Sequence, residues 1–109
     1  ESLLSARHYG VAQEVLDSLN NLFPMENWPR HARYMISRTL EHGVRRAEEM
    51  REVALTVQAA GLDQQMSQAT VERQAWAPKF AKALEQDKLL PLLDQMLAQL
   101  HSQAEKSKC

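Results

Sequence analysis

Four ionisable side chains stand close together near the middle of the chain and form its densest polar cluster. They are His42, Arg45, Arg46 and Glu49, which helical spacing places within about two turns. The rigid fork of donors on an arginine recognises a carboxylate or a phosphate, and a histidine can gain or lose a proton at working pH. The cluster is therefore a candidate site for binding an acid group.

Two interpretations of this cluster stay open from the residues alone. Arg46 stands beside Met50 and Val53 at helical spacing, so its guanidinium would be partly removed from water and would need an acidic partner. Glu49, one turn further on, is a structural candidate for that partner. Alternatively, Arg45 and Glu49 pair on a solvated face, where such a contact stabilises a helix by only about 0.2–0.5 kcal/mol. The cluster would then be an ordinary charged surface.

One long helix must position these side chains, and we predict it over about residues 29–60. Pro29 suits the first turn of a helix, Asn27 is a candidate cap, and Gly61 is typical of a left-handed C-terminal cap. Small or apolar residues recur at alternating spacings of four and three, which predicts one buried stripe: Ile36, Leu40, Gly43, Ala47, Met50, Ala54 and Val57.

Gly43 lies on this stripe in the middle of the predicted helix. A glycine in such a position costs about 0.5–1 kcal/mol relative to alanine, so its presence calls for a physical reason. The close approach of another backbone is the explanation that we favour. A kink in the helix at this point is the alternative.

The composition favours helices throughout the chain. Only three of the 109 residues are glycines, and no run of β-branched or aromatic residues alternates as it would in a strand. We predict an all-α fold, a helical bundle around the long helix, with a single domain over residues 1–101. The polar segment 102–109 is expected to be a disordered tail. Asp63 is the expected cap of the helix that follows the long one.

Charge and spacing argue against several kinds of partner. The formal net charge is −1, and the arginines of the long helix are interleaved with glutamates, which argues against a nucleic acid partner. No apolar stretch approaches the roughly 18 residues of a membrane span. His31 and His42 lie roughly 16 Å apart along a helix, so they cannot share a metal ion. We therefore predict no metal site and no membrane partner.

The two ends of the chain lead to two further expectations. Cys109 is the only cysteine, so no internal disulfide can form, and a reducing, cytoplasmic compartment fits. The chain begins with Glu1 rather than methionine, and Leu3 and Leu4 have the character of residues inside a helix. We therefore expect the chain to be part of a longer or processed protein.

The run from His42 to Glu52, followed by Thr56 and Gly61, resembles a stretch of a known enzyme family. It is similar to the C-terminal helical domain of dehydrogenases related to 6-phosphogluconate and β-hydroxyacid dehydrogenases. Within that family it resembles the subgroup whose C-terminal domain was catalogued as a domain of unknown function and assigned to a phosphogluconate dehydrogenase. Because segments 6–11 and 66–74 are also similar, the resemblance covers about residues 1–76.

This resemblance implies a function that the residues alone do not. The chain would be the substrate-side and dimerisation domain of an NAD(P)-dependent oxidoreductase acting on a hydroxy acid or sugar acid. A Rossmann domain of the same parent protein would bind NAD or NADP, and the helical domain would form a homodimer. Arg46 or Arg45 would hold the acid group of a small acidic substrate, while His42 and Glu49 would orient hydroxyls or the arginines.

The same resemblance also implies that the chain lacks part of the enzyme. The family's catalytic lysine lies upstream of residue 1, so no residue of this chain is catalytic and the chain alone would be inactive. The family's Lys-Asp-Leu segment corresponds to Glu48, Glu49 and Met50, and only the acidic and apolar character of the last two is kept. No glycine-rich dinucleotide turn is present in the sequence.

A second class of protein stays open beside the dehydrogenase domain. The C-terminal helix expected over residues 87–100 is apolar on more than one side, and such a helix needs two neighbours. Together with the Gly43 stripe it could simply build a homodimer. The alternative is thus a non-catalytic helical module for protein interaction.

Overall fold

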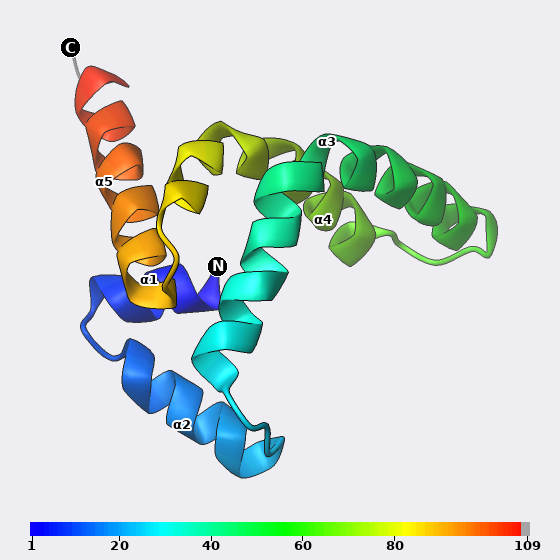
Figure 1. Ribbon diagram of the computed structural model, residues 1–109. Helices are drawn as coiled ribbons and strands as arrows, with labels where there is room; N and C mark the ends of the chain where they lie inside the picture. Colours follow the sequence, from blue (N-terminus) through cyan, green and yellow to red (C-terminus); the bar gives the residue numbers. More distant parts are fainter. Residues whose placement is uncertain (108–109) are drawn as a thin grey trace. The chain divides into compact units, whose positions relative to one another are not determined.

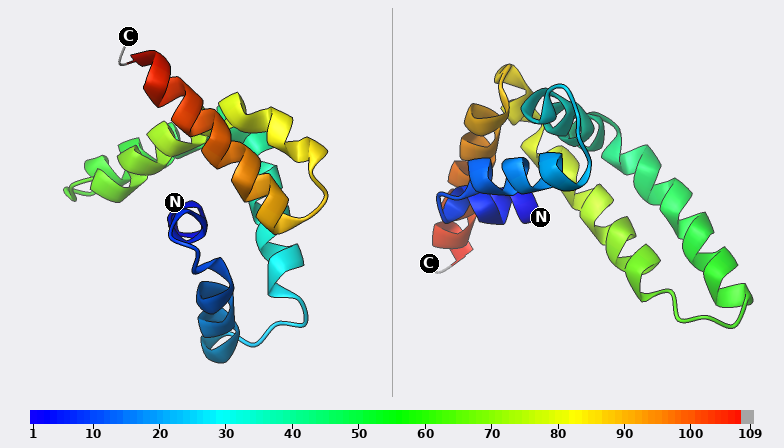
Figure 2. Two further views of the ribbon diagram at one scale, coloured as in Figure 1. Left: turned by 90° about the vertical axis from the view of Figure 1, so that its left-hand side faces the viewer. Right: turned by 90° about the horizontal axis from the view of Figure 1, so that it is seen from below.

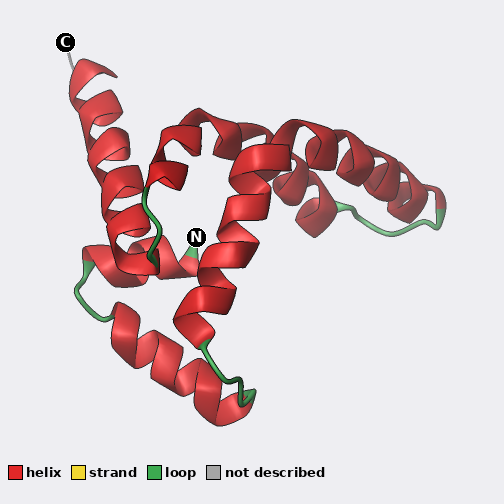
Figure 3. Cartoon of the chain, viewed as in Figure 1, coloured by secondary structure: helices red, strands yellow, loops and turns green. Residues whose placement is uncertain are grey.

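The computed structural model describes residues 1–107, and every regular element in that part of the chain is helical (Figure 3). The predicted all-α fold is confirmed. Cys109, which the sequence analysis singled out, lies outside the described residues. In chain order the elements are α1 (Ser2–His8), α2 (Ala12–Leu22), α3 (Trp28–Ala59), α4 (Gln65–Trp76), the 3-10 helix η1 (Ala77–Glu85) and α5 (Leu89–Ser107) (Figure 1).

Helix α3 is the predicted long helix, and its ends fall within one residue of the expected ones. At its N-terminus, the side-chain oxygen Oδ1 of Asn27 accepts a hydrogen bond of 3.1 Å from the backbone N–H of Arg30. Asn27 therefore caps the helix, because it satisfies a donor that has no partner within the first turn.

The C-terminal end of α3 is closed by Gly61, as expected. Gly61 has a backbone φ of +86°, a conformation that residues with a Cβ rarely adopt. Its N–H donates to the carbonyl of Gln58 at 2.9 Å, and the N–H of Leu62 donates to the carbonyl of Val57 at 3.3 Å. This pair of hydrogen bonds is the Schellman motif, which satisfies the last carbonyls of a helix.

The chain packs as two compact units, one from Glu1–Met35 with the segment that begins at Lys82 and one from Ile36–Ala81. Helix α5 continues to Ser107, past residue 101, where the sequence analysis placed the start of a polar tail. That residues 1–101 act as one domain stays a prediction.

In the first unit, α1 packs against both α2 and α5 (Figures 1 and 2). Arg7 of α1 and Asp94 of α5 form a two-point ion pair, with Nε–Oδ1 at 2.8 Å and Nη2–Oδ2 at 3.1 Å. The core of this unit comes from small and aliphatic side chains, each of which stabilises the fold by removing apolar surface from water. The buried residues are Ala6, Ala12, Leu16, Ala32, Ala83, Leu89, Leu92, Leu93 and Met96.

In the second unit, the part of α3 after Ile36 and helix α4 run side by side in opposite directions, joined by the loop 60–64 (Figures 1 and 2). All seven members of the predicted stripe are buried or half-buried, so the stripe is confirmed. The second unit buries Ser37, Leu40, Ala47, Ala54, Val71, Ala77 and Phe80.

The start of α4 differs from the expectation. Gln64, and not Asp63, occupies the N-cap position, and no side chain caps the helix. The carboxylate Oδ2 of Asp63 instead accepts a hydrogen bond of 3.3 Å from Nε2 of Gln65. Asp63 stands one residue too early because the Schellman motif and the loop after it extend further than the sequence pattern indicated.

Candidate functional site

The candidate cluster begins at a break in α3. His42 has non-helical backbone angles, φ −119° and ψ 16°, so α3 consists of two helical segments that meet there. Next to it, a Cβ on Gly43 would clash with the backbone carbonyl oxygen of Gln74 and would stand only 2.7 Å from Cδ of Pro78. Both explanations of Gly43 therefore hold, since the kink and the close approach occur at adjacent residues.

At this junction α4 and η1 come close to the backbone of α3. The end of α4 and the start of η1 reach the α3 backbone only because position 43 carries no side chain. Trp76 packs on Phe80 with ring centroids 4.5 Å apart, and the guanidinium of Arg73 lies 4.5 Å from the centroid of the Trp76 ring. The aromatic pair and the cation–π contact hold this segment together beside the junction.

His42 is bound to its neighbour in the chain. Its Nε2 lies 3.4 Å from a carboxylate oxygen of Glu41, and about a third of the imidazole is exposed to solvent. The contact is an ion pair only when the imidazole is protonated. His42 is thus accessible to a small molecule. Its ionisable partner in the structure is the adjacent Glu41 and not a member of the cluster.

Arg45 and Glu49 pair with each other one turn apart. The Nε of Arg45 lies 3.7 Å from Oε1 of Glu49, and the two side chains are 61% and 65% exposed. A pair with this spacing and exposure contributes a few tenths of a kcal/mol at most. The contact has the spacing and exposure expected of a pair on a solvated charged face.

Arg46 differs from Arg45 in both burial and partners. Its side chain is half-buried, and it makes no ion pair or hydrogen bond with any residue of the part that the structure describes. Glu49, the structural partner considered for it, pairs with Arg45 instead. Arg46 is therefore a partly desolvated cation whose fork of donors is available to an acidic ligand.

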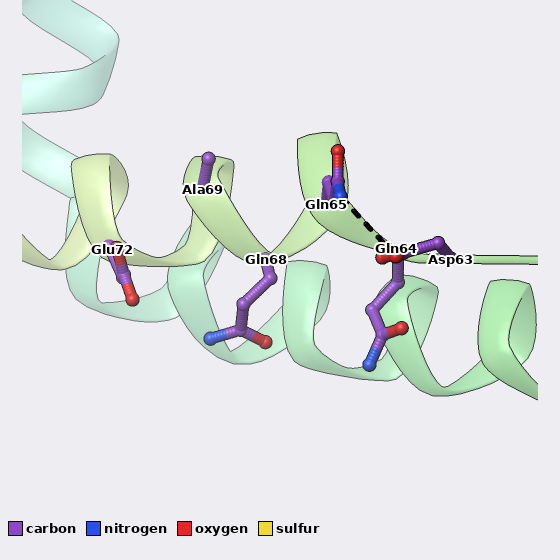
Figure 4. A pocket seen from close by; sticks show the side chains of 6 residues that line it. All are labelled: Asp63, Gln64, Gln65, Gln68, Ala69 and Glu72. Carbon is purple, nitrogen blue, oxygen red and sulfur yellow. Dashed lines mark hydrogen bonds between the residues drawn. The ribbon is translucent and has the colours of Figure 1, made fainter.

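Clefts occur elsewhere on the described part of the chain. Three clefts, with volumes of about 350, 200 and 400 Å³, are lined by other residues. The first lies along α4 and is lined by Asp63, Gln64, Gln65, Gln68, Ala69 and Glu72 (Figure 4). The side chains of Gln64, Gln68 and Glu72 extend from the same side of the helix, and Ala69 lies on the other side. With amides and two carboxylates but no cation, this cleft is unsuited to an acidic substrate.

Two residues with notable environments were not predicted from the sequence. The side-chain oxygen of Gln74 is buried without a hydrogen-bond partner in the described part of the chain, beside the Gly43 junction. Arg33 is half-buried and donates to the carbonyls of Leu84 and Gln86. Neither could be recognised beforehand, because the atoms around them come from segments 31 to 53 residues away in the sequence.

The described part of the chain offers few groups that could hold a metal or a cofactor. The described residues contain no group of three or more histidine, cysteine, aspartate or glutamate side chains that could hold a metal ion. They contain no strand, and their glycines stand at positions 10, 43 and 61, so they do not fit the turn that binds a dinucleotide. No helix among the described residues combines the length and the apolar character needed to cross a bilayer.

The geometry thus defines an all-helical protein whose long helix is broken beside a charged cluster. The model of the family called Domain of unknown function DUF1932 matches residues 6–77, about two thirds of the chain, and the chain belongs to this family. No curated protein and no solved structure matches the chain.

Proposed function

We propose that this chain is the substrate-side and dimerisation domain of an NAD(P)-dependent oxidoreductase that acts on a hydroxy acid or sugar acid. The observation that carries the proposal is the extent of the family match, residues 6–77, which coincides with the region of resemblance, about residues 1–76. Membership of a family of unknown function agrees with the subgroup that the resemblance singled out.

The acid group of the substrate is assigned to Arg46. Arg45 already has a carboxylate partner in Glu49, whereas Arg46 is half-buried and has no ion pair with a described residue. A charge-assisted hydrogen bond to a partly desolvated arginine is stronger than one to an exposed arginine. His42, at the break in α3 and one third exposed, would contact a substrate hydroxyl.

The remaining parts of the active site would come from elsewhere in the parent protein. The described residues do not fit a dinucleotide, so NAD or NADP would be held by a Rossmann domain, which would also bring the catalytic lysine. Residues of this chain would bind and orient the substrate but would not transfer the hydride. The chain alone is therefore expected to be inactive with NAD(P)H and any sugar acid, and turnover by the 109-residue chain would contradict this division of roles.

The assignment of Arg46 is tested in the parent enzyme by steady-state kinetics with a panel of sugar acids. We expect Arg46→Ala to lower kcat/KM roughly 30-fold, which corresponds to a loss of about 2 kcal/mol from one charged hydrogen bond. Arg51→Ala is the matched control, because Arg51 is an exposed arginine on the same helix. If both variants keep full catalytic efficiency, the cluster is only a charged surface.

A helical interaction module is the second candidate function, and one observation favours it. Several large apolar side chains of the second unit are exposed: Val44, Val53, Leu55, Leu62 and Met66, the last with 86% of its surface accessible. A homodimer would cover some of them. Both candidate functions predict a homodimer, and sedimentation equilibrium tests for it. A monomer at high protein concentration would contradict dimerisation in both. Unchanged catalysis in Arg46→Ala with a retained dimer would favour the module.

A further inference from the structure

A cleft of about 400 Å³ in the first unit is lined only by residues outside the candidate cluster. It lies between the first turns of α3 and the segment that leads into α5. Three of its lining side chains are cations and one is an anion, which gives a net charge of +2. The lining residues are Asn27, Pro29, Arg30, Arg33, Asp87, Lys88 and Leu89.

Arg33 is the fixed point of this cleft. Its Nε and Nη2 donate to the carbonyl oxygen of Gln86 at 3.1 and 2.9 Å, and Nη2 also reaches the carbonyl of Leu84 at 3.3 Å. Its partners are neutral carbonyls and not carboxylates, so the positive charge of the half-buried guanidinium is not neutralised. Its Nη1 makes no hydrogen bond with a described residue and keeps its two hydrogens as donors for a ligand.

The other two cations of the cleft are also without an acidic partner. Neither Arg30 nor Lys88 forms an ion pair with a residue in the described part of the chain. The carboxylate of Asp87 lines the same cleft, yet it forms no ion pair with any of the three. The start of α3 adds the partial positive charge of a helix N-terminus. Three cations thus line one cleft, and none of them forms an ion pair with an acidic side chain in the described part of the chain.

We propose that this cleft binds a small dianion of the phosphate monoester type. Unpaired like charges repel one another, and a doubly charged oxyanion would relieve this repulsion. Arg30 offers a complete guanidinium fork, Arg33 the two hydrogens of Nη1, and Lys88 a mobile ammonium group. The volume lies in the range of small-molecule sites. The site uses none of the residues assigned to the proposed function and stands or falls independently of it.

The binding site is tested by titrating the ¹⁵N-labelled protein with inorganic phosphate at constant ionic strength and about pH 7.5, where phosphate is largely dianionic. We expect saturable shifts of the backbone amides of Arg30, Arg33 and Lys88, with a dissociation constant on the order of millimolar. Raising the salt concentration should weaken binding, because the cleft is open to solvent. Shifts that never saturate, or that acetate reproduces equally well, would overturn the proposal.

Matched variants separate the cleft from general surface charge. The double variant Arg30→Gln, Lys88→Gln should bind phosphate at least tenfold more weakly, whereas Asp87→Asn should bind it a few-fold more tightly. Arg51→Gln, an exposed arginine of the second unit, is the control and should leave the affinity unchanged. All substituted side chains are exposed, so folding should be preserved, and a thermal melt verifies this. Equal affinity in the double variant would contradict the site whatever the outcome for Arg46.

Discussion

The backbone carbonyl oxygen of Gln74 occupies the position that a side chain on Gly43 would need. Pro78 closes the same space, with its ring carbons 2.7 and 2.8 Å from where a Cβ would stand. The approach of α4 and η1 to α3 therefore depends on the absence of a Cβ at position 43. It also explains why a residue with poor helix propensity stands in the middle of a long helix.

Gly43→Ala should destabilise the protein although alanine is the better helix former. Helix propensity favours the variant by about 0.5–1 kcal/mol, but the Cβ must displace a backbone carbonyl, and overpacking of this kind costs about 1–3 kcal/mol or more. We expect a net loss of about 1 kcal/mol or more in urea unfolding. Val44→Ala, at the exposed neighbouring position, is the control and should change little. An increase in stability of Gly43→Ala would disprove the close approach.

Gln74→Met should stabilise the second unit. The buried side-chain oxygen of Gln74 has no hydrogen-bond partner in the described part of the chain, and such an atom costs about 1–3 kcal/mol of desolvation. Methionine has a similar length and flexibility and carries no polar oxygen. We expect a gain of about 1 kcal/mol in denaturant unfolding. A loss of stability would mean that the amide makes a favourable interaction in solution.

The ion pair between Arg7 and Asp94 should make stability depend on pH in the acid range. The hydrogen bond from Arg7 lowers the pKa of Asp94 below its ordinary value of 3.8, and the hydrogen bond to Asp94 raises that of Arg7. Since the folded carboxylate holds its charge to a lower pH than the unfolded one, its contribution is complete above about pH 4 and is lost as the pH falls through the folded pKa.

The measurement for this pair is the melting temperature of wild type and of Asp94→Asn as a function of pH. The variant should be less stable above pH 4, and the difference should shrink on further acidification. Asp17→Asn serves as the control, because Asp17 is also exposed in the first unit but accepts its hydrogen bond from Gln13, an uncharged side chain. Parallel profiles for wild type and Asp94→Asn would contradict a charged interaction.

Removal of the pair between Arg45 and Glu49 should have almost no effect on stability. Both side chains are more than half exposed, and the atoms lie 3.7 Å apart, so the expected loss for either alanine variant is about 0.3 kcal/mol or less. Thermal melts at low and high salt would detect this difference. A loss larger than about 1 kcal/mol would show that the pair supports the fold and is more than a solvated contact.

The sequence predicted the course of α3 well because its signals are local. A spacing of four and three, an asparagine before the first turn and a glycine after the last depend only on neighbouring residues, and Asn27 and Gly61 both act as expected. The all-α fold follows from the same kind of evidence. Asp63 was wrongly expected to cap α4, because a cap residue is recognised only once the first turn of the helix is known.

The environment of each polar residue could not be predicted in the same way. Arg45 and Arg46 are adjacent in the sequence, yet one is exposed and paired while the other is half-buried and has no ion pair with a described residue. Arg33 owes its role to carbonyls more than 50 residues away. Spacing along a helix identifies which residues share a face, but it does not say what packs against that face.

The two units differ in whether they come from one continuous stretch of sequence, and this difference affects the order in which they fold. The second unit comes from the continuous stretch Ile36–Ala81, whereas the first joins both ends of the chain, with Arg7 and Asp94 separated by 87 positions. Bringing distant segments together carries a larger entropic cost and slows folding. During synthesis the paired helices α3 and α4 can therefore pack together first. The first unit can be completed only after α5 has been synthesised, because α1 packs against α5.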